Sequence, residues 1–336
     1  MNADAVALVA RARGLRRHVA APVELAALAR LDRLGALGDA LARLGLARLG
    51  APVAGVASAA ELAHREHASE LLGVLGRWRG RGRDVVAIEL ATEERRALRA
   101  LARGAAQGVP AELRLAGQLP TPDLSPRRLA RLAGAADPLE FGKRLIALDW
   151  PDAPAIARAT AATRPDLGAV ERLLRARWHL RLGELARVAD TELRREIEAA
   201  IDLENGCAAA ALAGSAPAAR GEGFLAGGRE LDRRRFGRAV ATADPGAALA
   251  LVAGAFLRPP IRDALREAAT MPSRTEELVT AARHALALRE ARVHPLGGAP
   301  VLELVLALRL EGLAMRRLAW GLALGAPEAE RWRAAA

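Results

Sequence analysis

The sequence has no tyrosine, a single cysteine and a single lysine, and each scarcity narrows what the chain can do. Cys207 has no second cysteine to pair with, so no internal disulfide is possible, which is typical of a reducing compartment. Lys143 is the only lysine, and no glycine-rich loop precedes it. The sequence therefore lacks the phosphate-binding pattern G-x-x-x-x-G-K-[ST], and we expect no ATP hydrolysis by that route.

Other signatures of catalysis and membrane insertion are also missing. The patterns G-x-G-x-x-G, H-E-x-x-H and G-x-S-x-G do not occur. No stretch reaches the roughly 18 uncharged apolar residues of a spanning helix, and the nearest, over 295–308, contains Glu303. The N-terminus, which carries Asp4, lacks the cationic start, apolar core and cleavage site of a signal peptide. We expect a soluble cytoplasmic protein that is not an enzyme and holds no cofactor or metal.

The composition favours an all-α protein and an anionic partner. Aromatic residues make up 3% of the chain, yet apolar residues make up 52%, so the hydrophobic mass comes from leucine, alanine and valine. Alanine, leucine and arginine are strong helix formers. The formal net charge of +11 suits a nucleic acid, an acidic protein surface or an anionic membrane, and does not choose among them.

Hydrophobic periodicity predicts helices along the whole chain and no sheet. Leucines recur every three or four residues from Leu25 to Leu44, and Gly35 and Gly38 interrupt this series. The pattern indicates one amphipathic helix or two short ones. Ser125 precedes Pro126, a combination that often begins a helix. Further helices are expected over 59–75, 84–103, 129–148, 169–211, 236–266 on either side of Pro259-Pro260, 275–292 and 301–324.

Two breakers rich in proline, glycine or serine, at 119–126 and 213–223, divide the chain into similar thirds. The predicted helical units are therefore 1–117, 118–222 and 223–336. Segments 129–150 and 236–257 resemble each other and share Ala-Asp-Pro, and 28–49 is a weaker third copy. These similarities indicate threefold internal repetition, although chance similarity in a sequence of low diversity would look the same.

A few residues could carry chemistry. His64 and His67 lie in E-x-x-H-x-x-H-x-x-E over Glu61–Glu70, and helical spacing makes a metal site conceivable. A solvated helix face is the interpretation that we favour. Among the isolated candidates, His179 is interpreted as a packed or partly exposed helix residue, and Cys207 as a small buried hydrophobe rather than a nucleophile.

Arginine clusters are the candidates for a charged interface. Arginine beside an aromatic residue can bind phosphate and stack on bases, but no nucleic-acid-binding module is recognisable. An exposed loop that faces solvent or an acidic protein is therefore favoured. The clusters are Arg77, Arg79, Arg81 and Arg83, which surround Trp78, and Arg233–Arg235.

Three segments carry a family likeness. Asp202 and Asn205 form a D-x-x-N pattern, and Gly227 and Gly228 lie in the turn that follows, at 224–231. The third segment is a turn at 294–301 followed by a helix and a glycine, and its matching positions are Pro295, Glu311, Arg316 and Gly325. Together these segments resemble the C subunit of A/V-type ATP synthases, which is subunit d of the V-type ATPases.

This resemblance implies a fold and a function. The expected fold is an all-α funnel of three similar helical units with pseudo-threefold repetition. The expected function is that of a non-catalytic central-stalk subunit of a rotary ATPase, which joins the shaft subunits to the membrane proteolipid ring and transmits torque during proton or sodium transport. The protein would be peripheral on the inner face of the membrane and bind neither nucleic acid nor a small-molecule substrate.

Two alternatives stay open. An α-solenoid scaffold would have repeats of about 35–45 residues, each touching only its neighbours. A basic helical nucleic-acid-binding protein would use the arginine clusters.

Overall fold

The computed structural model describes residues 3–43, 57–76, 82–115, 118–161, 164–189, 191–214 and 223–328. Within these ranges the regular structure is helical and contains no strand, so the all-α prediction is confirmed. No helix among them is both long and apolar enough to cross a bilayer. The chain divides into two compact units: Met1–Trp178 with Ala307–Ala336, and His179–Leu306. These bounds differ from the three predicted units, whose repetition is not confirmed.

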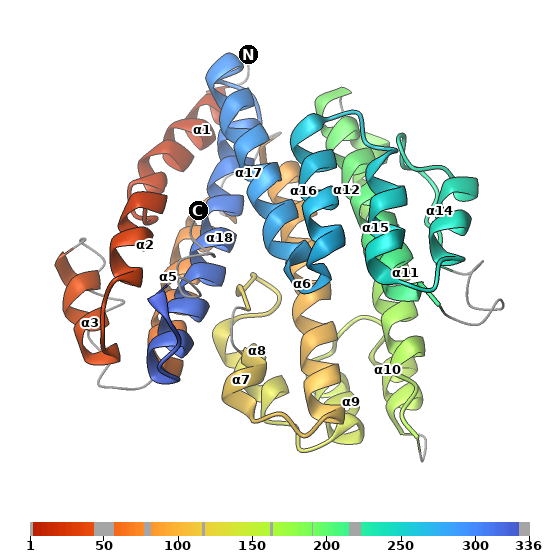
Figure 1. The fold of residues 1–336 in the computed structure, drawn as a ribbon, viewed down its shortest axis with the longest axis horizontal. Helices are drawn as coiled ribbons and strands as arrows, with labels where there is room; N and C mark the ends of the chain where they lie inside the picture. The colour runs from red at the N-terminus through yellow and green to blue at the C-terminus, as the bar shows by residue number, and fades with distance from the viewer. Residues whose placement is uncertain are drawn as a thin grey trace. The chain divides into compact units, whose positions relative to one another are not determined.

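The first compact unit contains the N-terminal helices and the last turns of the chain (Figure 1). Its helices are α1 (Ala3–Arg16), α2 (Pro22–Ala29), α3 (Leu34–Arg43), α5 (Ala57–Gly76), α6 (Gly82–Ala106), α7 (Ala111–Leu115), α8 (Pro126–Ala133), α9 (Pro138–Ile146) and α10 (Ala153–Thr160), with the first half of α11 (Leu167–Val188) and the last two-thirds of α18 (Ala299–Ala323).

The second compact unit begins within α11 and ends within α18. It contains α12 (Thr191–Leu212), α14 (Arg233–Val240), α15 (Pro245–Ala253), α16 (Pro259–Thr270), a 3-10 turn (Pro272–Arg274) and α17 (Thr275–Val293). Helices α14 and α15 pack against α12, and α16 packs against α15 (Figure 1).

Helix lengths follow a recurring order along the chain. Helices α8, α9 and α10 have 8, 9 and 8 residues, and two helices of 22 residues follow them. Helices α14, α15 and α16 have 8, 9 and 12 residues, and helices of 19 and 25 residues follow. Near the N-terminus, α2 and α3 have 8 and 10 residues and precede α5 and α6, which have 20 and 25.

The short helices α8, α9, α14 and α15 each begin where the sequence supplies a capping side chain, in three of them followed by proline. Asp137 accepts a hydrogen bond from the Glu140 amide at 2.8 Å, and Asp244 accepts one from the Ala247 amide at 2.6 Å. A proline at the first helical position follows each cap, because its missing N–H would be unpaired there anyway. The continuous helices predicted over 129–148 and across 244–245 are therefore wrong, since an Asp-Pro pair starts a new helix in each.

The remaining helix predictions agree with the structure to within a few residues, with two refinements. The leucine series over 25–44 forms two short helices, α2 and α3, but the break lies at 30–33 and both glycines belong to α3. The stretch over 169–211 is divided into α11 and α12. Ser125 caps α8 as expected, accepting a hydrogen bond from the Arg128 amide at 3.4 Å.

Three hydrophobic clusters can be followed among the described residues, and each includes side chains from the second half of a long helix. Leu98 and Leu101 of α6 pack with Phe141 and other side chains of α8–α11. Ala209 of α12 packs with Phe236 and other side chains of α14–α17. In both, a long helix supplies one wall for the shorter helices that follow it.

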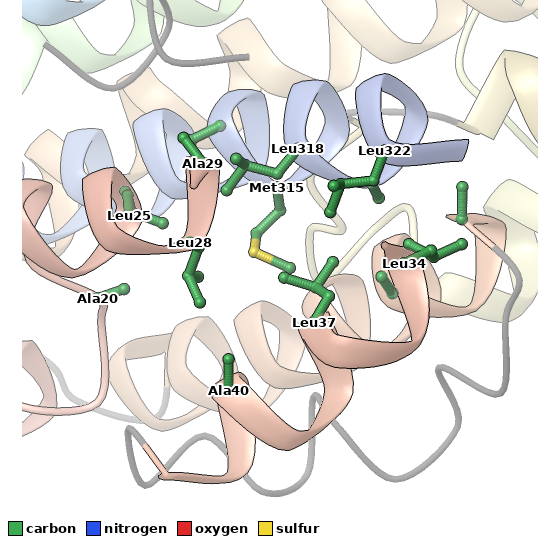
Figure 2. Packing of buried hydrophobic residues seen from close by; sticks show 14 of the residues in the cluster. Ala20, Leu25, Leu28, Ala29, Leu34, Leu37, Ala40, Met315, Leu318 and Leu322 are labelled. Atoms are coloured by element: carbon green, nitrogen blue, oxygen red, sulfur yellow. The ribbon is translucent and has the colours of Figure 1, made fainter. Parts of the chain in front are cut away.

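The third cluster joins the two ends of the chain. Figure 2 shows Met315, Leu318 and Leu322 of α18 pointing toward side chains of α2 and α3. Leu28 and Leu37 are among their partners, and both are almost fully buried. The last long helix thus supplies the wall for the first short helices, although nearly 300 residues of chain separate Leu28 from Leu318.

The first prediction tests the capping of α9. Asp137→Ala leaves the Glu140 amide without its acceptor, so we expect a loss of about 1 kcal/mol in the free energy of unfolding. Asp137→Asn keeps a side-chain oxygen and should lose less than half as much. Urea denaturation followed by circular dichroism measures both. Equal losses for the two variants would show that the cap is not the source of the effect.

Candidate functional site

Three buried carboxylates near the middle of long helices hold the segments that precede short helices. Glu94 of α6, Asp202 of α12 and Glu311 of α18 expose 4%, 1% and 1% of their surface. Each accepts a hydrogen bond from a residue a few positions before α8, α14 or α2, respectively. We call these three contacts the carboxylate junctions.

The junction at Asp202 is made with three successive backbone amides. Its carboxylate accepts hydrogen bonds from the amides of Arg229 and Glu230, both at 2.8 Å, and from that of Leu231 at 3.1 Å. Asn205, on the same face of α12, binds both backbone groups of Leu225: its amide donates at 2.8 Å and its oxygen accepts at 2.9 Å. The D-x-x-N pattern therefore fixes the turn that leads into α14.

The glycines of that turn allow it to lie against α12. Gly227 has a φ of +99°, which side-chain-bearing residues rarely adopt. A Cβ on Gly228 would lie 2.1 Å from an oxygen of Asp202, far closer than real contacts. These two positions, picked out from the sequence, are brought together with Asp202.

The junction at Glu94 was not predicted. The Thr121 hydroxyl donates to Glu94 at 2.9 Å and accepts a hydrogen bond from the Leu124 amide at 3.0 Å. The adjacent residue, Ser125, caps α8. Glutamate on an arginine-rich helix looks like a solvated charge, so only comparison with Asp202 at the corresponding place in α12 could have revealed it.

The junction at Glu311 includes a histidine. One carboxylate oxygen accepts a hydrogen bond from the Ala20 amide at 2.6 Å, and the other lies 3.1 Å from Nε2 of His64 on α5. Gly312 lies against the same ring, since a Cβ there would be 2.9 Å from it. Through Glu311, α18 holds both the start of α2 and α5.

The favoured interpretation of Glu61–Glu70 as a solvated face is wrong for its first half. His64 and Glu61 are buried, and Glu61 accepts a hydrogen bond from the Trp320 indole at 2.7 Å. His67 contacts the His18 carbonyl at 2.7 Å, so the two histidines turn to different partners. Among the described residues, no group of three His, Cys, Asp or Glu side chains could hold a metal ion.

The other residues singled out from the sequence lie apart from the junctions. Pro295 is in the exposed turn between α17 and α18, and Arg316 is exposed although Glu311 is buried. Gly325 has a φ of +68° and follows the end of α18. Its amide donates a hydrogen bond to the Leu322 carbonyl at 3.3 Å, and the Ala326 amide donates one to the Gly321 carbonyl at 2.7 Å. Outside the described residues lie Arg77, Arg79 and Arg81, as does the side chain of Arg83.

Two isolated candidates belong to the second compact unit. His179 is half-buried, as expected, and its Nε2 lies 2.8 Å from the Ala226 carbonyl in the turn before α14. Cys207 is half-buried rather than buried, on α12.

A buried arginine that the sequence did not reveal fixes α7 to α8. Arg114 donates to the Ala133 carbonyl at 3.0 Å and also contacts the carbonyls of Val109 and Ala135. Burial lowers the pKa of this guanidinium from its ordinary value. Its partners are carbonyls at the ends of helices, an arrangement that stabilises helix C-termini.

The carboxylate junctions fix the backbone before a short helix, because each carboxylate accepts hydrogen bonds from amides or a hydroxyl there that would otherwise lack a partner. Comparison with family models and with curated proteins finds no match for the chain. The proposed function therefore rests on the residues and the contacts themselves.

The second prediction compares two glycines. Gly228→Ala should lower the free energy of unfolding by roughly 1–3 kcal/mol, because the new methyl group meets the Asp202 carboxylate. Gly237→Ala is the control: it lies within α14, has no atom within 4 Å of the added Cβ, and should be neutral or slightly stabilising. Thermal unfolding of both variants decides the matter. A Gly228→Ala protein as stable as the control would contradict the close approach.

The third prediction concerns Asp202 and Asn205. Replacing either with alanine leaves buried backbone groups of the turn without partners, at a cost of roughly 1–3 kcal/mol each. Asp202→Asn keeps one oxygen acceptor and should cost less than Asp202→Ala. Chemical denaturation provides the values. Wild-type stability in both alanine variants, combined with lost assembly, would instead make these residues interface groups.

Proposed function

We propose that the protein is a non-catalytic central-stalk subunit of a rotary A/V-type ATPase, which transmits torque between the shaft and the membrane proteolipid ring. The proposal takes the family likeness of the D-x-x-N, Gly-Gly and C-terminal segments as its starting point. Three features of the structure support it: the recurring order of helices, the equivalent carboxylate junctions, and the contact between the two ends of the chain.

The recurring helix order and the junctions support three related units. Glu94 and Asp202 each bind a residue 27 positions downstream, Thr121 and Arg229, just before the next series of short helices. Both helices then use their following turns to support the core of that series. Such agreement in position and sequence separation favours repetition over chance similarity among alanine, leucine and arginine.

The observation that carries the proposal is the contact between α18 and the N-terminal helices. In an open solenoid, each repeat touches only its neighbours, and the first and last repeats stay apart. Here Glu311 binds Ala20, and Met315 and Leu318 pack in one cluster with α2 and α3. A long helix from the last series therefore does for the first series what α6 and α12 do for theirs, which favours a closed threefold arrangement such as the expected funnel.

Closure suits a part that transmits torque. A rotating coupling element must not open or bend under load, and packed interiors deform little. Buried polar joints add directionality to this packing, because a displaced carboxylate would leave several backbone groups unpaired. The proposed role needs no covalent chemistry from this chain, only stiffness and two interfaces that do not slip.

The fourth prediction tests the function directly. A tagged chain purified from detergent-solubilised membranes of its native host should carry shaft and proteolipid-ring subunits with it in fixed stoichiometry. Mass spectrometry of the eluate identifies them, and Glu311→Ala, which breaks the closing junction, should reduce their recovery. Glu328→Ala, near the end of the described chain, is the control. Recovery of nucleic acid, or of the chain without rotary subunits, would refute the proposal.

A further inference from the structure

Helix α14 and the turn before it carry exposed arginines that form no ion pair in the described part of the chain. The two acidic side chains among them are occupied by backbone groups: Asp232 caps α14 by accepting the Arg235 amide at 2.7 Å, and Glu230 accepts the Leu257 amide at 3.4 Å. The charge of the arginines is therefore not neutralised by a described carboxylate, although Arg233 also lies over the ring of Phe224. We call Arg229, Arg233, Arg234 and Arg238 the α14 arginine group.

An apolar side chain lies beside this group. Leu257 lies in the turn between α15 and α16, in the same compact unit as α14, and exposes 78% of its surface. Two hydrogen bonds hold its turn against α14: the one from its own amide to Glu230, and one from Arg235 to the Gly254 carbonyl at 3.2 Å. A protein interface has a desolvated apolar centre and a polar rim, and Leu257 with the arginines beside it supplies one group of each kind.

Exposed arginines recur in the second helix series. Helix α8, which corresponds to α14 in the proposed repetition, exposes Arg127, Arg128 and Arg131. Trp150 stands at the place that corresponds to Leu257, but it is half-buried and packs against the core of its own series, so only the arginines recur at the surface. The first series differs, because α2 presents Val23, which is 73% exposed, and Ala27 at the arginine positions. The arginines are therefore a property of particular copies and not of the fold.

We propose that the α14 arginine group and Leu257 form a docking surface for an acidic protein surface that carries an apolar side chain. Arginine binds carboxylates through a planar fork of donors, and the spacing of Arg234 and Arg238 matches carboxylates one helical turn apart on a partner. If the proposed function holds, on which this assignment of the partner rests, the acidic surface belongs to the central shaft.

The side chains of this surface favour an acidic protein over an anionic membrane or a nucleic acid as the partner. Interfacial membrane helices bury a continuous apolar face, but the exposed positions of α14 are arginines, and Leu257 is the apolar group beside them. Single-stranded nucleic acid binds through stacked bases, but Phe224 is engaged by Phe236 at 5.5 Å between ring centroids and by Arg233 above its face.

The test uses the full chain and a synthetic helical peptide with glutamates one turn apart on either side of a leucine. Fluorescence anisotropy measures its affinity for wild type, for Arg233→Gln/Arg234→Gln/Arg238→Gln and for Leu257→Ser. We expect each of the two variants to bind the peptide at least about tenfold more weakly than wild type, since both the charges and the apolar contact contribute to affinity. The matched control, Arg194→Gln/Arg289→Gln/Arg292→Gln, removes the same charge from exposed positions of the same unit and should change affinity less than about threefold.

Parallel arms use the peptide with glutamine in place of glutamate, phosphatidylcholine vesicles with and without phosphatidylserine, and single-stranded DNA. The proposal is overturned if no peptide binds, if the glutamine peptide binds as well as the glutamate peptide, or if the control triple variant weakens binding as much as the α14 triple variant. It is also overturned if vesicles or DNA, and not the peptide, bind less well to the α14 triple variant. Co-purification of rotary subunits that is unaffected by the α14 triple would refute this surface and leave the proposed function standing. Selective peptide binding without rotary subunits would do the reverse.

Discussion

Glu311 ties the last long helix to the beginning of the chain, and the arrangement of the first compact unit depends on this joint. Its carboxylate holds the Ala20 amide and the His64 ring, and the next turns of α18 bury Met315 and Leu318 among α2, α3 and α5. Without α18, the short α2 and α3 would lose a wall of their core, because helices of 8 and 10 residues are marginal in isolation.

The three carboxylate junctions share a physical logic but differ in chemistry. Asp202 binds three backbone amides, Glu94 a hydroxyl, and Glu311 an amide and an imidazole. Burying a carboxylate costs free energy unless hydrogen bonds satisfy it, so such groups contribute to the choice of one arrangement more than to stability. They set where each series of short helices meets its long helix, while the leucine-rich clusters provide the stabilisation.

Much of the helical content could be predicted, because a sequence rich in alanine, leucine and arginine shows its periodicity clearly. The breaks at Asp137-Pro138 and Asp244-Pro245 carry capping signals that the sequence does show, but the apolar residues on both sides of each break favoured one continuous helix. The burial of His64 and the contact of Glu311 with Ala20 could not be read from the sequence. Both depend on residues hundreds of positions apart, and no local pattern encodes such a contact.

The association of α18 with the N-terminal helices is best tested by hydrogen exchange followed by mass spectrometry on Leu318→Ala. This substitution removes buried side-chain volume from α18 only, so any effect on α2 and α3 has to pass through the contact between the chain ends. The account predicts that amides of 22–43 lose protection while those of 233–270 keep theirs. Loss of protection confined to α18 itself, with 22–43 unchanged, would contradict it.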